Sequence, residues 1–333
     1  MEQQLIQAAR NGNLPELRRL VSMGANPAVL NNRALTWAAR HGHLDVIRYL
    51  ATLPDVNPRA QDDQAIIYAA ENGHIDVIKD LVINYGLNPG AQNNLALVRA
   101  AQNGYLDIVQ YLVGLPGVDP AARNNDAIVV AVRGGYLNIL EYLVGLPGVD
   151  PTVKNNLLIA EAAGFGYLNI VKFLINLPGV NPSARYNLAL HLAATNGHIE
   201  VVRYLIASPR VDISHRGILN IISEIYINNH WDIIRYLASL LGFDIQGTNY
   251  ELLYWIISKE LVEVGIALIN KFDLDPNVDE YHALIIALIS NNIYMVKVLG
   301  PYIKDPKNTN VLFAIEYAQS KGYNDIAYYL QSL

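Results

Sequence analysis

The sequence has 333 residues, of which 52% are hydrophobic and 16% charged, with a net charge of −6 and no cysteine. The lack of cysteine excludes disulfides, cysteine-ligated zinc, iron–sulfur clusters and thiol nucleophiles. The mildly acidic balance argues against nucleic-acid binding, and no apolar run reaches the roughly 18 residues of a candidate membrane span. The first residues also lack the basic and apolar segments of a secretory signal.

A short marker of the form Gly-His/Tyr-Leu/Ile-Asp recurs along the chain at intervals of 30 to 32 residues. Such a constant period is typical of a repeat architecture. Eleven copies predict eleven repeats, of which the first seven are the most regular. These seven begin at Gly12, Gly42, Gly73, Gly104, Gly135, Gly166 and Gly197. Degenerate copies, which lack the glycine, begin at Asn229, Lys259 and Asn291, and the last copy begins at Gly322.

The repeat Val118–Gly148 shows the expected local structure. Ala127–Val132 predicts a short first helix, whose small residues allow close packing. The marker Gly135 follows, and apolar residues at helical spacing then predict a longer second helix, namely Leu137, Leu140 and Val144. An extended, finger-like loop rich in proline and asparagine joins successive repeats.

Capping residues and prolines fit this scheme. We expect Asp45, Asp76 and Asp107 in the first turn of the second helix, where negative charge is favourable. The loop prolines follow the marker by 12 or 16 residues, so none falls in the middle of a helix. Pro15 is the exception, and it should occupy the first turn of a second helix, where its missing N–H has no cost.

The segments Ala34–Leu50, Ala65–Leu81 and Ala189–Ile206 resemble ankyrin repeats, with their Leu-His-x-Ala-Ala and Gly-His-x-x-Val-Val pattern. The resemblance implies an all-α repeat solenoid of about eleven helix-turn-helix units with short finger loops. It extends over residues 1–333 as a single array, with regular repeats over 1–210 and degenerate repeats and a C-terminal cap over 211–333.

The repeats depart from the family pattern in two ways. Their period is 31 instead of 33 residues, and the usual Thr-Pro pair is absent. An asparagine pair stands nearby in the finger, as in Asn31-Asn32 and Asn124-Asn125. We expect these side chains to hold the turn, because asparagine tolerates left-handed geometry and bonds to nearby backbone. This variety is similar to arrays in amoebae, large viruses and amoeba-dwelling bacteria.

Stacked repeats account for the apolar excess, because each interior unit is covered on two sides. Two later segments, Leu252–Ile257 and Leu284–Ile289, are apolar around most of a helix. Either these degenerate repeats pack more thickly, or residues 252–290 form a surface for a partner or for self-association.

Catalytic and metal sites are not expected. His41-Gly-His43 suggests a metal ligand pair, but the resemblance implies that His43, His74 and His198 bond to backbone. The carboxylates of Asp45, Asp76 and Asp107 lie one repeat apart and form no catalytic pair. We therefore expect no enzyme activity, no cofactor and no metal.

Binding is expected where the repeats differ from one another. The resemblance implies that the fingers and the first helices line a concave groove, at positions five and two residues before each marker. Exposed aromatic residues and arginines dominate many interfaces. The predicted partner-binding residues are Trp37, Arg40, Tyr68, Glu71, Arg99, Gln102, Val130, Arg133 and Glu161. The alternative is that Trp37 and Tyr68 only fill space between neighbouring helices.

The sequence thus predicts a non-catalytic, monomeric protein-interaction scaffold in the cytoplasm. If the source is an amoeba-dwelling bacterium, the resemblance would imply a secreted effector in the host cytosol. The alternative function is structural, with the apolar C-terminal repeats docking to another copy or subunit. An unrecognised enzyme is the weakest alternative.

Overall fold

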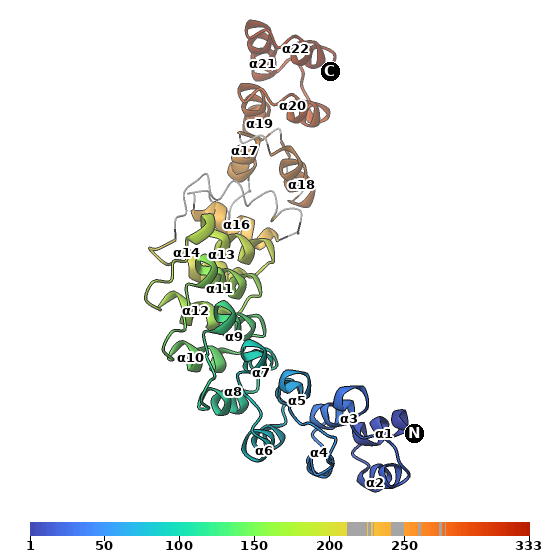
Figure 1. Cartoon of the computed structure of the whole chain (residues 1–333). Helices are drawn as coiled ribbons and strands as arrows, with labels where there is room; N and C mark the ends of the chain where they lie inside the picture. Colours follow the sequence, from blue (N-terminus) through green and yellow to red (C-terminus); the bar gives the residue numbers. More distant parts are fainter. Residues whose placement is uncertain are drawn as a thin grey trace. The chain divides into compact units, whose positions relative to one another are not determined.

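The computed structural model describes residues 1–211, 225, 228, 230–240, 250–258, 261–272, 275–276 and 278–333. Its contacts divide the chain into two compact units (Figure 1). Unit 1 comprises Met1–Ala193 with Ala207–Val211, and unit 2 comprises Ala194–Ile206 with Asp212–Leu333. The single array over residues 1–333 stays a prediction, and the markers at Asn229 and Lys259 lie outside the described residues.

Unit 1 is built from short helices, which alternate as the first and the second helix of successive repeats. The first helices are α1 (Glu2–Arg10), α3 (Val29–Arg40), α5 (Ala60–Glu71), α7 (Ala91–Gln102), α9 (Ala122–Arg133), α11 (Val153–Gly164) and most of α13 (Ala184–Thr195). The second helices are α2 (Leu14–Ser22), α4 (Leu44–Ala51), α6 (Ile75–Tyr85), α8 (Leu106–Val113), α10 (Leu137–Val144) and α12 (Leu168–Ile175).

The described part of unit 2 repeats the same arrangement. Its helices are α14 (Ile199–Ile206), α16 (Trp231–Leu240), α17 (Tyr250–Ser258), α18 (Val262–Phe272), α19 (Val278–Ile289), α20 (Ile293–Leu299), α21 (Thr309–Ser320) and α22 (Asn324–Gln331). A short 3-10 helix, η1 (Gly300–Tyr302), follows α20. First helices α17, α19 and α21 pack in sequence, as do second helices α18, α20 and α22. Among the described residues, no helix is long and apolar enough to cross a membrane.

The repeat Val118–Gly148 confirms the expected second helix, because α10 runs from Leu137 to Val144. The expected difference in length is not found: α9 includes the left-handed residues Arg123 to Asn125, and its part after them, residues 126–133, is as long as α10. The first helix continues through Arg133, and the turn at Leu146-Pro147-Gly148 limits the second. Pro15 lies in the first turn of α2, and Asp45 lies in the first turn of α4, as predicted.

Small residues let the first helices pack side by side. Pairs of alanines just before the marker are fully buried, among them Ala38-Ala39, Ala69-Ala70 and Ala100-Ala101. In unit 1, α1, α3, α5, α7 and α9 each contact the next first helix. Alanine keeps neighbouring backbones close and loses no side-chain entropy on burial. This close stacking positions every residue of the predicted binding face.

The marker glycine is required for two reasons. Gly104 has φ +83°, which is left-handed, and a Cβ there would lie 2.6 Å from Cε1 of Tyr136 in the next repeat. A Cβ at Gly12 would lie equally close to Nδ1 of His43. The histidine or tyrosine ring of one marker therefore packs against the glycine of the preceding marker. The His43 Nε2–H also donates to the carbonyl of Arg10 at 2.9 Å, as expected for this position.

The prediction for the asparagine pair is confirmed for its second residue only, and the left-handed turn is three residues long. Arg123, Asn124 and Asn125 have φ of 57°, 57° and 63°. Asn125 is buried, and its Oδ1 accepts a hydrogen bond from the backbone N of Asp150, one repeat later, at 2.9 Å. Asn32, Asn94 and Asn156 accept the same bond from Asn57, Asp119 and Asn181, at 2.8 to 2.9 Å.

Second helices are joined by a cation of one repeat and an aromatic ring of the next. Arg18 lies over the ring of Tyr49 at 5.0 Å, and Lys79 over that of Tyr111 at 5.5 Å. In the repeat between them, Asp80 occupies the position of the tyrosine. Arg48 donates to its Oδ1 from Nε at 2.9 Å and from Nη2 at 2.7 Å. A salt bridge thus replaces the cation–π contact there.

The apolar C-terminal segments are largely packed inside unit 2. Among their described side chains, those of Leu253, Ile256, Ile257, Leu284 and Leu288 are buried, whereas Ile289 is 57% exposed. This burial fits the thicker packing of degenerate repeats. Self-association through residues 252–290 stays a prediction.

Candidate functional site

The nine predicted residues all lie in unit 1, on the exposed side of its first helices. Trp37 and Arg40 belong to α3, Tyr68 and Glu71 to α5, and Arg99 and Gln102 to α7. Val130 and Arg133 belong to α9, and Glu161 to α11. None of the nine is buried, although the residues on either side of most of them are. We call this surface the first-helix face.

Trp37 is the centre of a cluster formed by Arg10, Trp37, Arg40 and Tyr68, the Trp37 cluster. The guanidinium carbons of Arg10 and Arg40 lie 4.9 and 5.5 Å from the centre of the indole ring. Arg40 also lies 5.2 Å from the ring of Tyr68. Such cation–π contacts hold arginines in place without neutralising them. Trp37 and Tyr68 therefore help to connect three repeats and remain accessible as well.

Two pockets open on the two sides of Trp37. The α3–α5 pocket has a volume of about 260 Å³ and is also lined by Leu30, Arg33, Arg40 and Tyr68. The α1–α3 pocket has a volume of about 300 Å³ and shares Leu30, Arg33 and Trp37 with the first. The predicted residues Trp37, Arg40 and Tyr68 thus border a hollow surface instead of a flat one.

Leu30 and Arg33 were missed from the sequence, because both lie in or beside the finger. Leu30 is 59% exposed and has φ 51°, a strained geometry for leucine. The equivalent residues of later repeats are polar, namely Gln61, Gln92, Arg123, Lys154 and Arg185. Comparison of this one position between repeats would have singled out Leu30.

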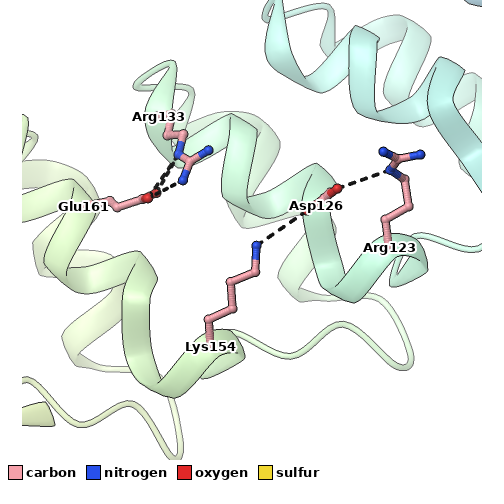
Figure 2. A network of polar contacts seen from close by, with 5 residues as sticks. All are labelled: Arg123, Asp126, Arg133, Lys154 and Glu161. Carbon is pink, nitrogen blue, oxygen red and sulfur yellow. Dashed lines mark hydrogen bonds and ion pairs between the residues drawn. The ribbon is translucent and has the colours of Figure 1, made fainter. Parts of the chain in front are cut away.

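Four of the remaining predicted residues form two pairs, Arg133 with Glu161 and Arg99 with Gln102, and Glu71 and Val130 take part in neither. Arg133 donates from Nε to the two carboxylate oxygens of Glu161, at 3.1 and 3.0 Å (Figure 2). These hydrogen bonds raise the pKa of Arg133 above its ordinary value. Arg99 donates to Oε1 of Gln102 at 2.7 Å. The structure therefore brings Trp37, Arg40 and Tyr68 together, and separately Arg133 and Glu161.

A second ion-pair group lies next to Arg133 and Glu161. Asp126 accepts from Nε of Arg123 at 3.2 Å and lies 3.7 Å from Nζ of Lys154 (Figure 2). The carboxylate joins the fingers of two repeats. Exposed pairs of this kind contribute little to stability, yet they leave this part of the surface nearly neutral. The first-helix face thus changes from cationic near α3 to charge-balanced near α9 and α11.

The histidines beside Trp37 do not resemble a metal site. His43 already donates to the carbonyl of Arg10, and His41 stacks on Trp37 with ring centres 5.6 Å apart. Burial lowers the pKa of His41, and the nearby Arg10, His43 and Arg40 lower it further. The described residues contain no group of three or more histidine, aspartate or glutamate side chains that could hold a metal ion.

Comparisons with known proteins agree with this geometry. A comparison with curated proteins gave no match. A family model described as ankyrin repeats in three copies matches residues 5–93, 66–155, 128–217 and 158–249, so the overlapping matches span residues 5–249. These residues include the whole first-helix face and every helix of unit 1 except the first residues of α1. The chain therefore belongs to the ankyrin-repeat family, whose members are generally protein–protein interaction modules and typically non-catalytic.

Proposed function

We propose that this chain is a non-catalytic scaffold that binds a partner protein through the first-helix face of unit 1. One observation carries the proposal, the Trp37 cluster with a pocket on each side. Tryptophan, tyrosine and arginine provide a large share of the energy in protein interfaces, above all where they line pockets. Here they stand on rigid helices whose other residues serve the stacking of repeats.

The contrast between buried and accessible positions supports this assignment. Between two marker glycines, the alanine pairs and the aliphatic residues vary little, because they pack against the next repeat. The position of Trp37 carries Tyr68, Arg99, Val130 and Glu161 in the next four repeats. A scaffold can change such positions freely without loss of packing, so they are available for recognition.

The double variant Trp37→Ala/Arg99→Ala tests the proposal with an identified partner. We expect a loss of affinity of about tenfold or more, because truncating a single central interface residue often costs 2 kcal/mol or more. Ile83→Ala is the matched control, since Ile83 is 73% exposed and lies on α6, a second helix of the same unit. Unchanged affinity of the double variant would remove the first-helix face from the proposal.

A separate variant addresses the structural alternative. Ile289→Ala alters the exposed apolar residue at the end of α19 in unit 2. Partner binding or self-association that is lost only in this variant would favour the assembly role. Light scattering across a range of concentrations measures self-association directly. The cytoplasmic location stays a prediction from the sequence.

A further inference from the structure

The charges around the two Trp37 pockets have one sign. Arg10, Arg33 and Arg40 are the charged side chains that line them, and no acidic residue is among their lining residues. Arg10 and Arg40 contact aromatic rings, and none of the three arginines forms an ion pair within the described part of the chain. This concentration of positive charge is unexpected in a chain with a net charge of −6.

Other arginines of unit 1 form ion pairs with carboxylates. Arg48 pairs with Asp80, Arg123 with Asp126, and Arg133 with Glu161. The fold thus supplies carboxylates to arginines at several comparable places, but not beside Trp37. Three like charges around one ring repel one another, which favours an anionic group that arrives from outside.

The same hollow also exposes apolar surface. Leu30 contributes to both pockets, and Ile6 contributes to the α1–α3 pocket. Gln61 and Gln92, at the position of Leu30, donate to backbone carbonyls of the preceding finger, those of Asn31 and Gln61. Leu30 cannot form such a hydrogen bond, and its side chain instead provides an apolar surface for a ligand side chain.

We propose that the two Trp37 pockets bind a short acidic segment of the partner protein, in which a carboxylate side chain adjoins a large apolar one. The apolar side chain lies against Leu30 and Trp37, and the carboxylate accepts hydrogen bonds from Arg33 and Arg40. The proposal rests on the proposed function and specifies the chemistry of its partner. Planar guanidinium groups suit carboxylates, because two parallel hydrogen bonds can form.

A phage-displayed library of random twelve-residue peptides, selected on the whole protein at low salt, tests this inference. We expect enriched peptides to carry aspartate or glutamate within two residues of leucine, isoleucine or an aromatic residue. Synthetic copies should bind roughly two- to fivefold more weakly for each arginine removed in Arg33→Gln and Arg40→Gln. Leu30→Gln should weaken binding as well, and it introduces the side chain that the next two repeats carry.

Matched controls separate charge from position. Arg19→Gln changes the net charge by the same amount, but Arg19 lies on α2, a second helix outside the pockets, so this variant should leave affinity unchanged. Higher salt should weaken binding to the wild-type protein more than to Arg33→Gln/Arg40→Gln. Circular dichroism of each variant verifies that the helices are intact.

Several outcomes would overturn the inference. They are an absence of enriched peptides, enrichment without acidic residues, or equal binding to Arg33→Gln/Arg40→Gln. Displacement of the peptide by a ten-nucleotide single strand of DNA at similar concentration would show a general anion site instead. If peptides fail while Trp37→Ala/Arg99→Ala still abolishes binding of an identified partner, the proposed function stands and only the acidic class is wrong.

Discussion

Replacing Asn125 by alanine should destabilise unit 1 at one defined contact. The buried Oδ1 of Asn125 accepts from the backbone N of Asp150 at 2.9 Å, and the residue has φ 63°. Loss of the acceptor costs about 1 to 3 kcal/mol, with the lower part of the range expected because Asp150 is exposed. Left-handed geometry adds up to about 1 kcal/mol for alanine relative to asparagine. Together they amount to roughly 1 to 3 kcal/mol.

Asn124→Ala is the matched control. Asn124 has φ 57° and is exposed, so alanine there meets the same backbone geometry without losing the contact to the next finger. We expect Asn124→Ala to lower the free energy of unfolding by at most about 1 kcal/mol. The difference between the two variants then measures the hydrogen bond that joins one finger to the next.

Two measurements check this prediction. Urea unfolding followed by circular dichroism gives the overall loss, although a long array does not always unfold in one step. Hydrogen exchange of the Asp150 amide reports the contact itself, and Asn125→Ala should lose protection there while Asn124→Ala should not. Equal destabilisation by both variants, or unchanged protection of this amide, would refute the assigned role of Asn125.

Two further predictions concern contacts between repeats, and a third concerns the titration of His41. Gly104→Ala should lower the free energy of unfolding in urea more than Gly117→Ala does. Both glycines have φ +83°, but only a Cβ at Gly104 would meet a tyrosine ring of the next repeat. Equal losses of stability in the two variants would contradict this explanation. Asp80→Ala should lower the free energy of unfolding by about 1 to 3 kcal/mol. Asp80→Tyr should be tolerated, because it restores the residue type of Tyr49 and Tyr111. A larger loss of stability in Asp80→Tyr than in Asp80→Ala would show that a tyrosine cannot replace the salt bridge at this position. The pKa of His41 is lower in the folded protein than its ordinary value of 6.5. The unfolded chain therefore takes up the proton first, so stability is complete above about pH 6.5 and falls as the pH drops toward the folded pKa. His41→Gln should reduce this loss between pH 7.5 and 5.5, and an identical pH dependence would show that His41 is not its cause.

The repeating features could be predicted from the sequence because every repeat shows them again. The bounds of α10 and the place of Pro15 follow from the marker and its period, and the backbone bond of His43 follows from the resemblance to ankyrin repeats. The three-residue length of the finger turn could not, because its first residue is Arg123 in one repeat and Leu30 in another. Left-handed geometry at such residues is imposed by the packing of the fingers, not by local preference.

The candidate site was only partly predictable for a related reason. Position within the repeat identified Trp37, Arg40 and Tyr68, because exposed positions vary between copies. It could not show that Arg133 and Glu161 pair with each other. Arg133 lies two residues before its marker glycine, whereas Glu161 lies five residues before the next one, so the two positions are not equivalent in the repeat. The pockets depend on the width of the spaces beside Trp37, and no single-sequence pattern encodes that width.

The bond from each finger to the next has a consequence for how such a chain can change in length. Asn32, Asn94, Asn125 and Asn156 each accept from an amide 25 residues later in the sequence. Removal or duplication of one whole period would therefore rejoin an acceptor with an equivalent donor. Unequal recombination within the gene could therefore add or remove a repeat and still preserve the hydrogen bonds between neighbouring fingers. The surface around Trp37 would not change.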